Sequence, residues 1–128
     1  MYVAGGPPGR LGPQKSQTRF GNISDGLTNT IFFGDKHVRA GREGEAGQGD
    51  CSIYNGDLIA CAERAAGTLV PLALSVTEGN RTQFGSNHPN VVQFAFGDGS
   101  VKPIQTSISP AILDLLAMRS DGMAIPNF

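Results

Sequence analysis

Residues 84–104, FGSNHPNVVQFAFGDGSVKPI, decide the fold of this chain. The central run, 91–96, is rich in β-branched and aromatic residues and is bounded by turn-forming residues on both sides. Asp98-Gly99 tolerates a positive φ at little cost, so the chain can reverse there and run out again as a second strand. Pro103 lacks a backbone donor and fits an edge strand or a strand end, so it should limit that second strand. The stretch predicts a β-hairpin.

The alternation within residues 91–96 predicts which side of the hairpin is buried. Val92, Phe94 and Phe96 recur at period two and share one face, while smaller or polar residues occupy the other. The face with the larger side chains should belong to the core. Just before the strand, His88 should anchor the loop that opens the hairpin through hydrogen bonds of its ring nitrogens. Its alternative roles are those of a metal ligand or a base, because histidine changes charge near neutral pH.

The same hairpin carries a family signature. His88, nine residues and then Asp98-Gly99 resemble the spacing after which the prepilin-type processing-associated H-X9-DG domain family is named, a pseudopilin-like family of unknown function. Three other segments resemble parts of that family in its order: ISDGLTNTIFFGD at 23–35, SIYNGD at 52–57 and ILDLLAMRSDGMAIPNF at 112–128. The resemblance covers roughly residues 20–128. It implies a loop-rich, pseudopilin-like globular head, in which His88, Asp98 and Gly99 mark a structural motif.

Length and composition bound the class of protein. A chain of 128 residues is one domain by its size, here residues 20–128, preceded by an extended surface arm at 1–19 with several Gly-Pro turns. The 18 Gly and 8 Pro predict many loops and little helix. With a formal net charge of -1, the chain has no basic field to hold a phosphate backbone, which argues against nucleic acid as a partner.

The sequence contains no predicted membrane anchor. No window approaches eighteen apolar residues, and the N-terminus lacks the apolar centre of a signal peptide. Members of the resembled family carry a prepilin leader and a long hydrophobic helix, and this sequence departs from that pattern. Membrane contact is therefore expected only through an N-terminal helix that this chain lacks. The resemblance implies an extracytoplasmic location, at the cell surface or in the envelope.

A helix is predicted near the C-terminus. Ser109 can cap it, Pro110 suits the first helical position, and the helix should run to about Arg119. Asp114 should face outward, and Gly122 should lie beyond the end in a left-handed conformation. The side chains expected on its buried stripe are Ile112, Leu113, Leu115 and Leu116. One helix packed on an antiparallel sheet, an α+β fold, is the simplest architecture.

Shorter elements are predicted in the first half of the chain. Ser24 or Asp25 should cap a short helix through residues 27–29. Residues 30–33 should form a buried strand that ends at Gly34.

The two cysteines, Cys51 and Cys61, leave three possibilities: a bridge, two buried thiols or metal ligands. Neither Cys-x-x-Cys spacing nor a nearby histidine pair exists, which argues against a thiolate metal site. The resemblance implies an exported domain. Disulfides form in the oxidising compartments outside the cytoplasm, so the resemblance favours a bridge between Cys51 and Cys61.

Calcium is the more reasonable metal hypothesis, because hard cations take oxygen ligands from carboxylates, Asn side chains and loop carbonyls. The candidate ligands in Gly-rich loops are Asp50, Asn55, Asp57 and Asp98. Related pseudopilins can hold calcium in a distal loop, but no segment here matches the regular twelve-residue calcium loop. No other cofactor is expected.

Three functions remain open. The favoured one is the non-catalytic head of a pseudopilin-like or type IV pilin-like protein, which acts in cell-surface or secretion-system assembly through protein partners or self-assembly. The second is an extracellular module that binds calcium, sugar or peptide through the loops at 39–57. A hydrolase is the third and least favoured, because Ser86 beside His88 lacks the Gly-x-Ser-x-Gly elbow.

Overall fold

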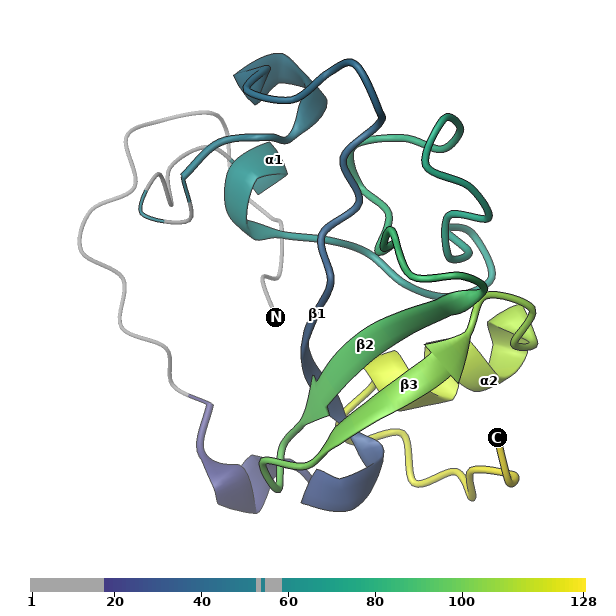
Figure 1. Cartoon of the computed structure of the whole chain (residues 1–128). Coiled ribbons are helices and arrows are strands. Elements are labelled where there is room, and N and C mark those ends of the chain that lie inside the picture. The colour runs from purple at the N-terminus through teal and green to yellow at the C-terminus, as the bar shows by residue number, and fades with distance from the viewer. Residues whose placement is uncertain (1–17, 53, 55–58) are drawn as a thin grey trace.

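A three-stranded antiparallel sheet with the strand order β1-β2-β3 organises the chain (Figure 1). The computed structural model describes residues 18–52, 54 and 59–128. β1 spans Ile31–Gly34, β2 spans Val91–Phe96, β3 spans Val101–Gln105, and helix α2 spans Pro110–Ala117. The helix packs against one face of the sheet. The predicted α+β architecture is confirmed.

The β2–β3 hairpin forms because its turn satisfies its own polar groups. Gly99 adopts a φ of 85°, and the Asp98 carboxylate accepts hydrogen bonds from the Ser100 N–H and Oγ at 2.9 and 2.7 Å. The second strand does not stop near Pro103 but continues to Gln105. β3 is an edge strand paired with β2 alone, so a residue without an N–H can sit there with its missing donor directed away from the partner.

The core lies between the sheet, α2 and the loop that carries Leu72. The predicted core face of β2 is confirmed: Val92 and Phe94 are 0% exposed and Phe96 is 2% exposed. Phe84 adds an edge-on contact to Phe94, with ring centroids 5.1 Å apart. The other buried members of this cluster are Leu72, Ile104, Leu113 and Leu116.

α2 is shorter than predicted. It ends at Ala117 rather than near Arg119, because Met118 is already extended. Ser109 occupies the N-cap position, but its side chain forms no capping hydrogen bond. Gly122 has the expected left-handed φ, 72°, yet it lies well beyond the last helical residue and does not cap the helix.

The buried stripe of α2 is also narrower than predicted. Leu113 and Leu116 are fully buried, whereas the other two residues of the expected stripe are half-buried. Asp114 does not point into open solvent. Its carboxylate accepts a hydrogen bond from the Thr68 hydroxyl and lies against Gly67, which has no side chain to obstruct it. Asp114 therefore attaches a loop to the helix.

β1 forms where it was predicted, but its phenylalanines are exposed. Phe32 is 40% exposed and Phe33 is 73% exposed. β1 is the second edge of the sheet, and Phe33 stands opposite Ala95 on the face away from α2. The prediction of a buried strand is wrong because a short apolar run does not reveal whether a layer covers each of its faces.

The predicted cap of the short helix is wrong as well. Residues Leu27–Asn29 form a 3-10 helix, η2, with no side-chain capping bond from Ser24 or Asp25. The Asp25 carboxylate instead accepts hydrogen bonds from two N–H groups of the C-terminal tail, those of Asp121 and Gly122, at 2.8 and 2.9 Å. Desolvation alone would raise the pKa of Asp25, but these hydrogen bonds lower it. Asp25 thus ties the tail to the first half of the chain.

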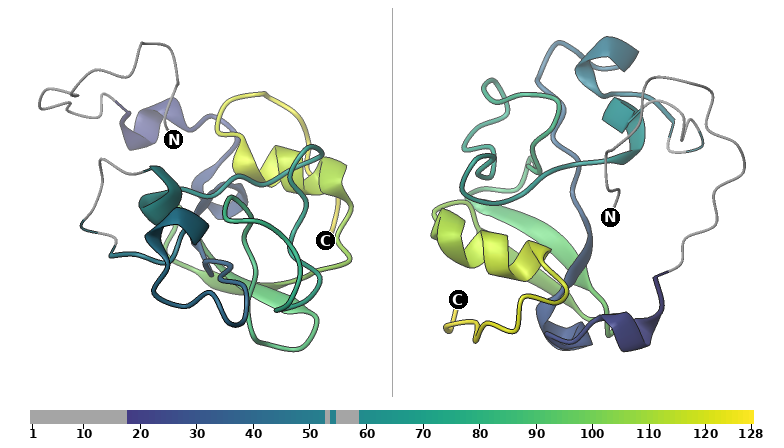
Figure 2. Two further views of the ribbon diagram at one scale, coloured as in Figure 1. Left: turned by 90° about the horizontal axis from the view of Figure 1, so that it is seen from above. Right: turned by 180° about the vertical axis from the view of Figure 1, so that it is seen from behind.

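Long connections surround the sheet (Figure 2). The remaining short helices are η1 at Phe20–Asn22, η3 at Ala46–Gln48 and α1 at Ile59–Ala62. The connection from α1 to β2 gathers at the end of β2 opposite the hairpin turn (Figure 1). Most of the predicted N-terminal arm, residues 1–17, lies outside the described residues. No helix in the described part of the chain is long and apolar enough to cross a membrane.

Candidate functional site

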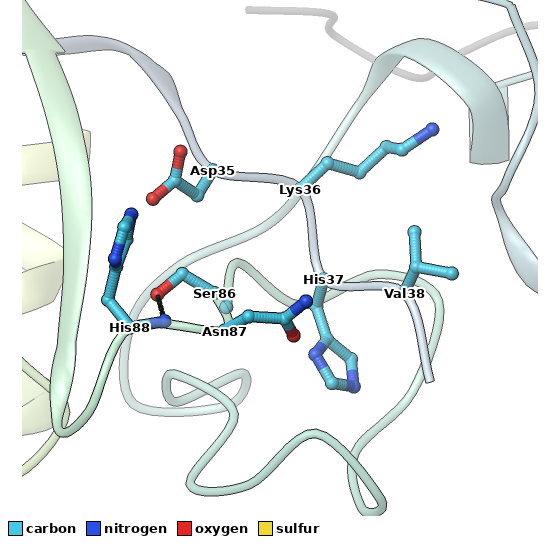
Figure 3. A pocket seen from close by; sticks show the side chains of 8 residues that line it. Asp35, Lys36, His37, Val38, Ser86, Asn87 and His88 are labelled. Atoms are coloured by element: carbon cyan, nitrogen blue, oxygen red, sulfur yellow. Dashed lines mark hydrogen bonds between the residues drawn. The ribbon is translucent and has the colours of Figure 1, made fainter. Parts of the chain in front are cut away.

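A polar cavity of about 320 Å3 opens beside His88 (Figure 3). One segment leaving β1 and one segment leading into β2 form its walls. The lining residues are Asp35, Lys36, His37, Val38, Gly85, Ser86, Asn87 and His88. Both histidines of the chain and four other polar or charged side chains therefore meet in one place, although some fifty positions separate the segments in the sequence.

Asp35 holds these two segments together. Its N–H donates to the Gln93 carbonyl at 3.0 Å, and its own carbonyl accepts from the Gly85 N–H at 3.1 Å. The carboxylate Oδ2 also accepts from the Gln93 N–H at 3.0 Å. These bonds extend the pairing of β1 with β2 and attach the segment that carries His88. Asp35 has a structural role in the sheet as well as a place on the cavity wall.

Ser86 closes the loop that contains His88. Its Oγ donates to the Val91 carbonyl at 2.6 Å and accepts from the His88 N–H at 3.0 Å. The His88 ring is exposed and forms no hydrogen bond with another described residue. The predicted anchoring role of the ring is therefore wrong. The loop is anchored by the His88 backbone and the Ser86 hydroxyl, while the ring projects beside Asp35 (Figure 3).

The cavity holds the residue types of a hydrolytic triad without their chain of hydrogen bonds. Nucleophilic catalysis needs a hydroxyl bonded to a base that is itself oriented by an acid. The Ser86 hydroxyl is bonded to backbone groups on both sides, and one oxygen of Asp35 is bonded to the sheet. In the described residues this arrangement offers hydrogen-bonding groups to a polar ligand, and it contains no activated serine.

His37 is a member of this site that no sequence pattern identifies. Its side chain is 2% exposed, and its Nε2 has no hydrogen-bond partner within the described part of the chain. Two glycines leave room for the His37 ring. A Cβ added to Gly85 would lie 2.8 Å from Nδ1 of His37, and a Cβ added to Gly79 would lie 3.1 Å from Nε2. A lone histidine between Lys36 and Val38 gives no signal of burial, because the glycines that enclose it are distant in sequence.

The candidate calcium ligands are not assembled in the described residues. The Asp50 carboxylate forms an ion pair with Lys36 at 3.2 Å, and its second oxygen accepts a backbone N–H at 2.6 Å. Asp98 lies at the hairpin turn, far from η3 and the Asp50 region (Figure 1). Asn55 and Asp57 lie outside the described residues. Within the described chain, no group of three or more His, Cys, Asp or Glu residues is placed to hold a metal.

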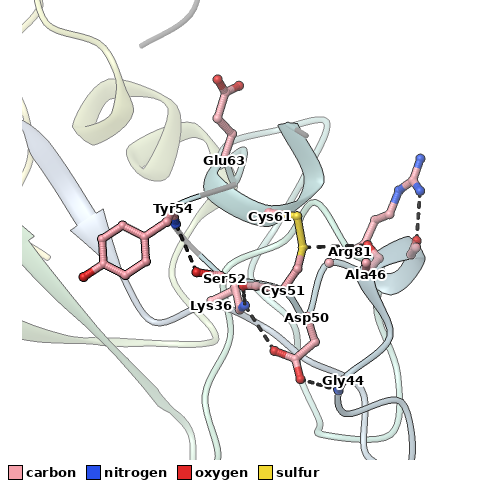
Figure 4. The surroundings of a disulfide bond; sticks show 12 residues. Lys36, Gly44, Ala46, Asp50, Cys51, Ser52, Tyr54, Cys61, Glu63 and Arg81 are labelled. Atoms are coloured by element: carbon pink, nitrogen blue, oxygen red, sulfur yellow. Dashed lines mark hydrogen bonds and ion pairs between the residues drawn. A yellow bond between two sulfur atoms is a disulfide. The ribbon is translucent and has the colours of Figure 1, made fainter. Parts of the chain in front are cut away.

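A disulfide joins Cys51 to Cys61, with their Cα atoms 5.1 Å apart (Figure 4). The bridge connects the segment after η3 to α1, and Cys61 is 1% exposed. Lys36 attaches the bridged segment to the strand region, because its Nζ bonds both the Asp50 carboxylate and the Cys51 carbonyl, at 3.2 and 3.3 Å. Because both cysteines are in the disulfide, neither is available as a thiolate ligand for a metal.

The sequence also matches a known family. The family model described as "Protein of unknown function (DUF1559)" matches residues 5–111. The chain belongs to the DUF1559 family. The match includes β1, the disulfide-bridged segment and the whole hairpin, and it ends just inside α2. No curated protein and no solved structure matches the chain.

His88→Ala should have little effect on the stability of this DUF1559 domain. We expect the free energy of unfolding to change by less than about 0.5 kcal/mol, because the lost ring is exposed and forms no hydrogen bond with another described residue. Ser86→Ala should cost about 1–3 kcal/mol, since it leaves the Val91 carbonyl without its partner. Urea denaturation measures both variants. A larger loss for His88→Ala than for Ser86→Ala would contradict the roles assigned to the two residues.

His37 should make stability depend on pH. Burial lowers the pKa of His37 below the ordinary value of 6.5, and the charges of Arg64 and Arg39 lower it further, against a hydrogen bond to the Glu78 backbone. The unfolded chain therefore takes up a proton at a pH where the folded chain does not. Stability from this residue is fully present above pH 6.5 and falls as the pH decreases below that value.

The measurement is the free energy of unfolding of the natural chain and of His37→Gln between about pH 7.5 and 5, a range in which carboxylates contribute little. Gln keeps a polar side chain that does not titrate. We expect the natural chain to lose more stability than His37→Gln as the pH falls. Equal pH slopes for the two proteins would refute the assignment to His37.

Proposed function

We propose that this chain is the non-catalytic head of a prepilin-type assembly protein, which acts through protein contacts at the cell surface or in a secretion system. The observation that carries the proposal is the outer face of the sheet, opposite α2. Phe33, Ala95 and Val101 form one row across all three strands. Phe33 is 73% exposed and Val101 is 64% exposed. A row of exposed apolar side chains on a regular sheet is typical of a protein interaction surface.

Two further features support an extracytoplasmic assembly role. The resemblance of the His88–Gly99 segment to prepilin-type proteins covers the hairpin that builds this face. The disulfide between Cys51 and Cys61 suits an oxidising compartment. The proposed function uses no cofactor. The proposal does not depend on calcium, because both oxygens of Asp50 and Oδ1 of Asp98 already have protein partners.

Site-specific photo-crosslinking in the cells that naturally produce the protein tests this proposal. A photoreactive phenylalanine analogue at position 33 or 101 should form covalent adducts with another envelope protein or a second copy. The matched control is the same analogue at Leu69, which is 94% exposed but lies in a loop. Adducts enriched at 33 and 101 over 69 would support the proposal. Equal labelling at all three positions, or no adducts, would refute it.

The His88 cavity favours a second candidate, an extracellular module that binds a polar ligand such as a sugar. Asp35, Asn87 and His88 offer side-chain donors and acceptors on its walls, which are the groups that orient small polar ligands. A nuclear magnetic resonance screen with simple sugars should then shift the amide signals of residues 85–88. Shifts that persist unchanged in His88→Ala would argue against binding in this cavity.

A further inference from the structure

A second groove, of about 650 Å3, lies along β1, and none of its lining residues belongs to β2. Its walls come from η1, from β1 with the residue before it, and from the end of α2. The lining residues are Thr18, Arg19, Phe20, Ile23, Thr30, Ile31, Phe32, Phe33, Ala117 and Arg119. Four consecutive residues, 30–33, line the groove. The groove therefore extends along the length of the strand and is not confined to one side chain.

The floor of the groove is aromatic. Phe20 and Phe32 stack with ring centroids 6.3 Å apart and an angle of 3° between their planes. They remain 67% and 40% exposed, and Phe33 beside them is 73% exposed. Three exposed phenylalanines at one edge present a large apolar area to solvent, and a partner side chain that covered them would gain from its burial.

The groove also offers an unpaired strand edge. β1 pairs with β2 on one side, and among the described residues no strand pairs with the other side of Ile31–Gly34. An open edge presents N–H and C=O groups that an extended peptide can pair with by adding a strand. The groove therefore matches an extended segment better than a globular surface.

The charge of the groove selects the partner. Arg19 and Arg119 lie on its walls, and no Asp or Glu is among the described residues that line it. Neither guanidinium forms an ion pair with another described residue; Arg119 donates one hydrogen bond to the Thr18 hydroxyl at 2.8 Å. Two arginines without acidic partners beside an aromatic floor complement a ligand that carries both apolar side chains and carboxylates.

We propose that this groove binds an extended segment of a partner protein that carries acidic residues on either side of an apolar or aromatic side chain, and that the segment pairs with β1. The inference rests on the assembly function proposed above and specifies the chemistry of one partner. The N-terminal residues 1–17 of the same chain are a poor occupant by charge, because they contain Arg10 and Lys15 and no Asp or Glu.

The test uses the full chain and a blocked heptapeptide, Glu-Thr-Val-Thr-Phe-Thr-Glu, whose alternate residues place both glutamates and the apolar side chains on one face of a strand. A matched peptide carries Lys in place of both Glu. Titrations followed by amide chemical shifts should show binding of the glutamate peptide at Ile31–Phe33, weaker binding of the lysine peptide, and a decrease of the difference at high salt.

Variants of the protein test the arginines. Arg19→Gln and Arg119→Gln should each weaken binding of the glutamate peptide by up to about fivefold at low salt. The double charge reversal, Arg19→Glu with Arg119→Glu, should reverse the preference between the two peptides. Arg42→Gln is the control, since its side chain is 51% exposed and lies outside the groove. Amide spectra of each variant verify that it is folded.

Several outcomes would overturn the inference. These are equal affinity for the two peptides, unchanged binding by the double variant, or shifts confined to residues outside the groove. A dimer that sedimentation detects and that Arg19→Glu abolishes would make a second copy the occupant and would also overturn it. Val101 lies on the outer face but not in the groove, so the crosslinking test at position 101 is independent of these measurements and their failure leaves it unaffected.

Discussion

Phe94→Ala should lower the free energy of unfolding by about 3–5 kcal/mol, the largest effect expected for a single substitution in this chain. Phe94 is 0% exposed and lies in the middle of β2, within the cluster that joins the sheet to α2. Phe84 packs edge-on against it at 5.1 Å between ring centroids. On the neighbouring strand a Cβ added to Gly34 would lie 2.5 Å from the ring, so the ring fills the space over that glycine. Removal of the ring leaves a cavity between the Gly34 backbone and the side chains of the core cluster.

Urea denaturation measures this loss. Val101→Ala is the matched control, because Val101 belongs to the same hairpin but is 64% exposed on the outer face; its substitution should change stability by less than about 0.5 kcal/mol. Since Phe94→Ala removes much of the stability of a small domain, Phe94→Leu provides a milder variant that should give an intermediate loss. Comparable losses for Phe94→Leu and Val101→Ala would contradict the central place of Phe94 in the core.

Loss of the Cys51–Cys61 disulfide should cost roughly 2.5–3 kcal/mol, the second largest effect. The bridge closes a loop with a sequence separation of 10, and its removal restores conformational freedom to the unfolded chain. For a domain of this size that loss corresponds to a decrease in the melting temperature of about 10 °C. Cys51→Ala with Cys61→Ala is the suitable variant, because serine at position 61 would place a hydroxyl at a site that is 1% exposed.

Thermal unfolding with and without reductant completes this test. The natural chain should melt at a lower temperature after reduction, and the double alanine variant should be insensitive to the reductant. If reduction left the melting temperature of the natural chain unchanged, the bridge would not contribute to the stability of the fold. A reductant effect of equal size in the double variant would show that the effect does not come from the disulfide.

Three local predictions that depend on neighbouring residues are confirmed. The run at 91–96, Asp98-Gly99 and Ser109-Pro110 each contain their own strand, turn or helix-start signal, and each forms the expected element. These signals act over a few residues through backbone sterics and local hydrogen bonds. These three signals therefore do not depend on which distant segments pack against the hairpin or the helix.

The candidate site was less predictable than the fold. His88 carries the motif that identifies the hairpin, but its ring is exposed, and its loop is held by Ser86. His37 and Asp35 join it only because β1 pairs with β2 and the segment before β2 pairs back onto the residue after β1. Such contacts depend on which strands become neighbours. That information is absent from spacing within a short window.

The sequence by itself determined the hairpin, its buried face and the start of the C-terminal helix, because alternation and turn chemistry are local properties. Only the tertiary structure decided that Phe32 and Phe33 are exposed and that His37 is buried. The physical reason is coverage: an apolar side chain on an edge strand is buried only if another layer packs over it, and a polar ring is buried if distant glycines leave space around it. The exposed edge and outer face of the sheet, where the proposed function lies, are consequences of that coverage.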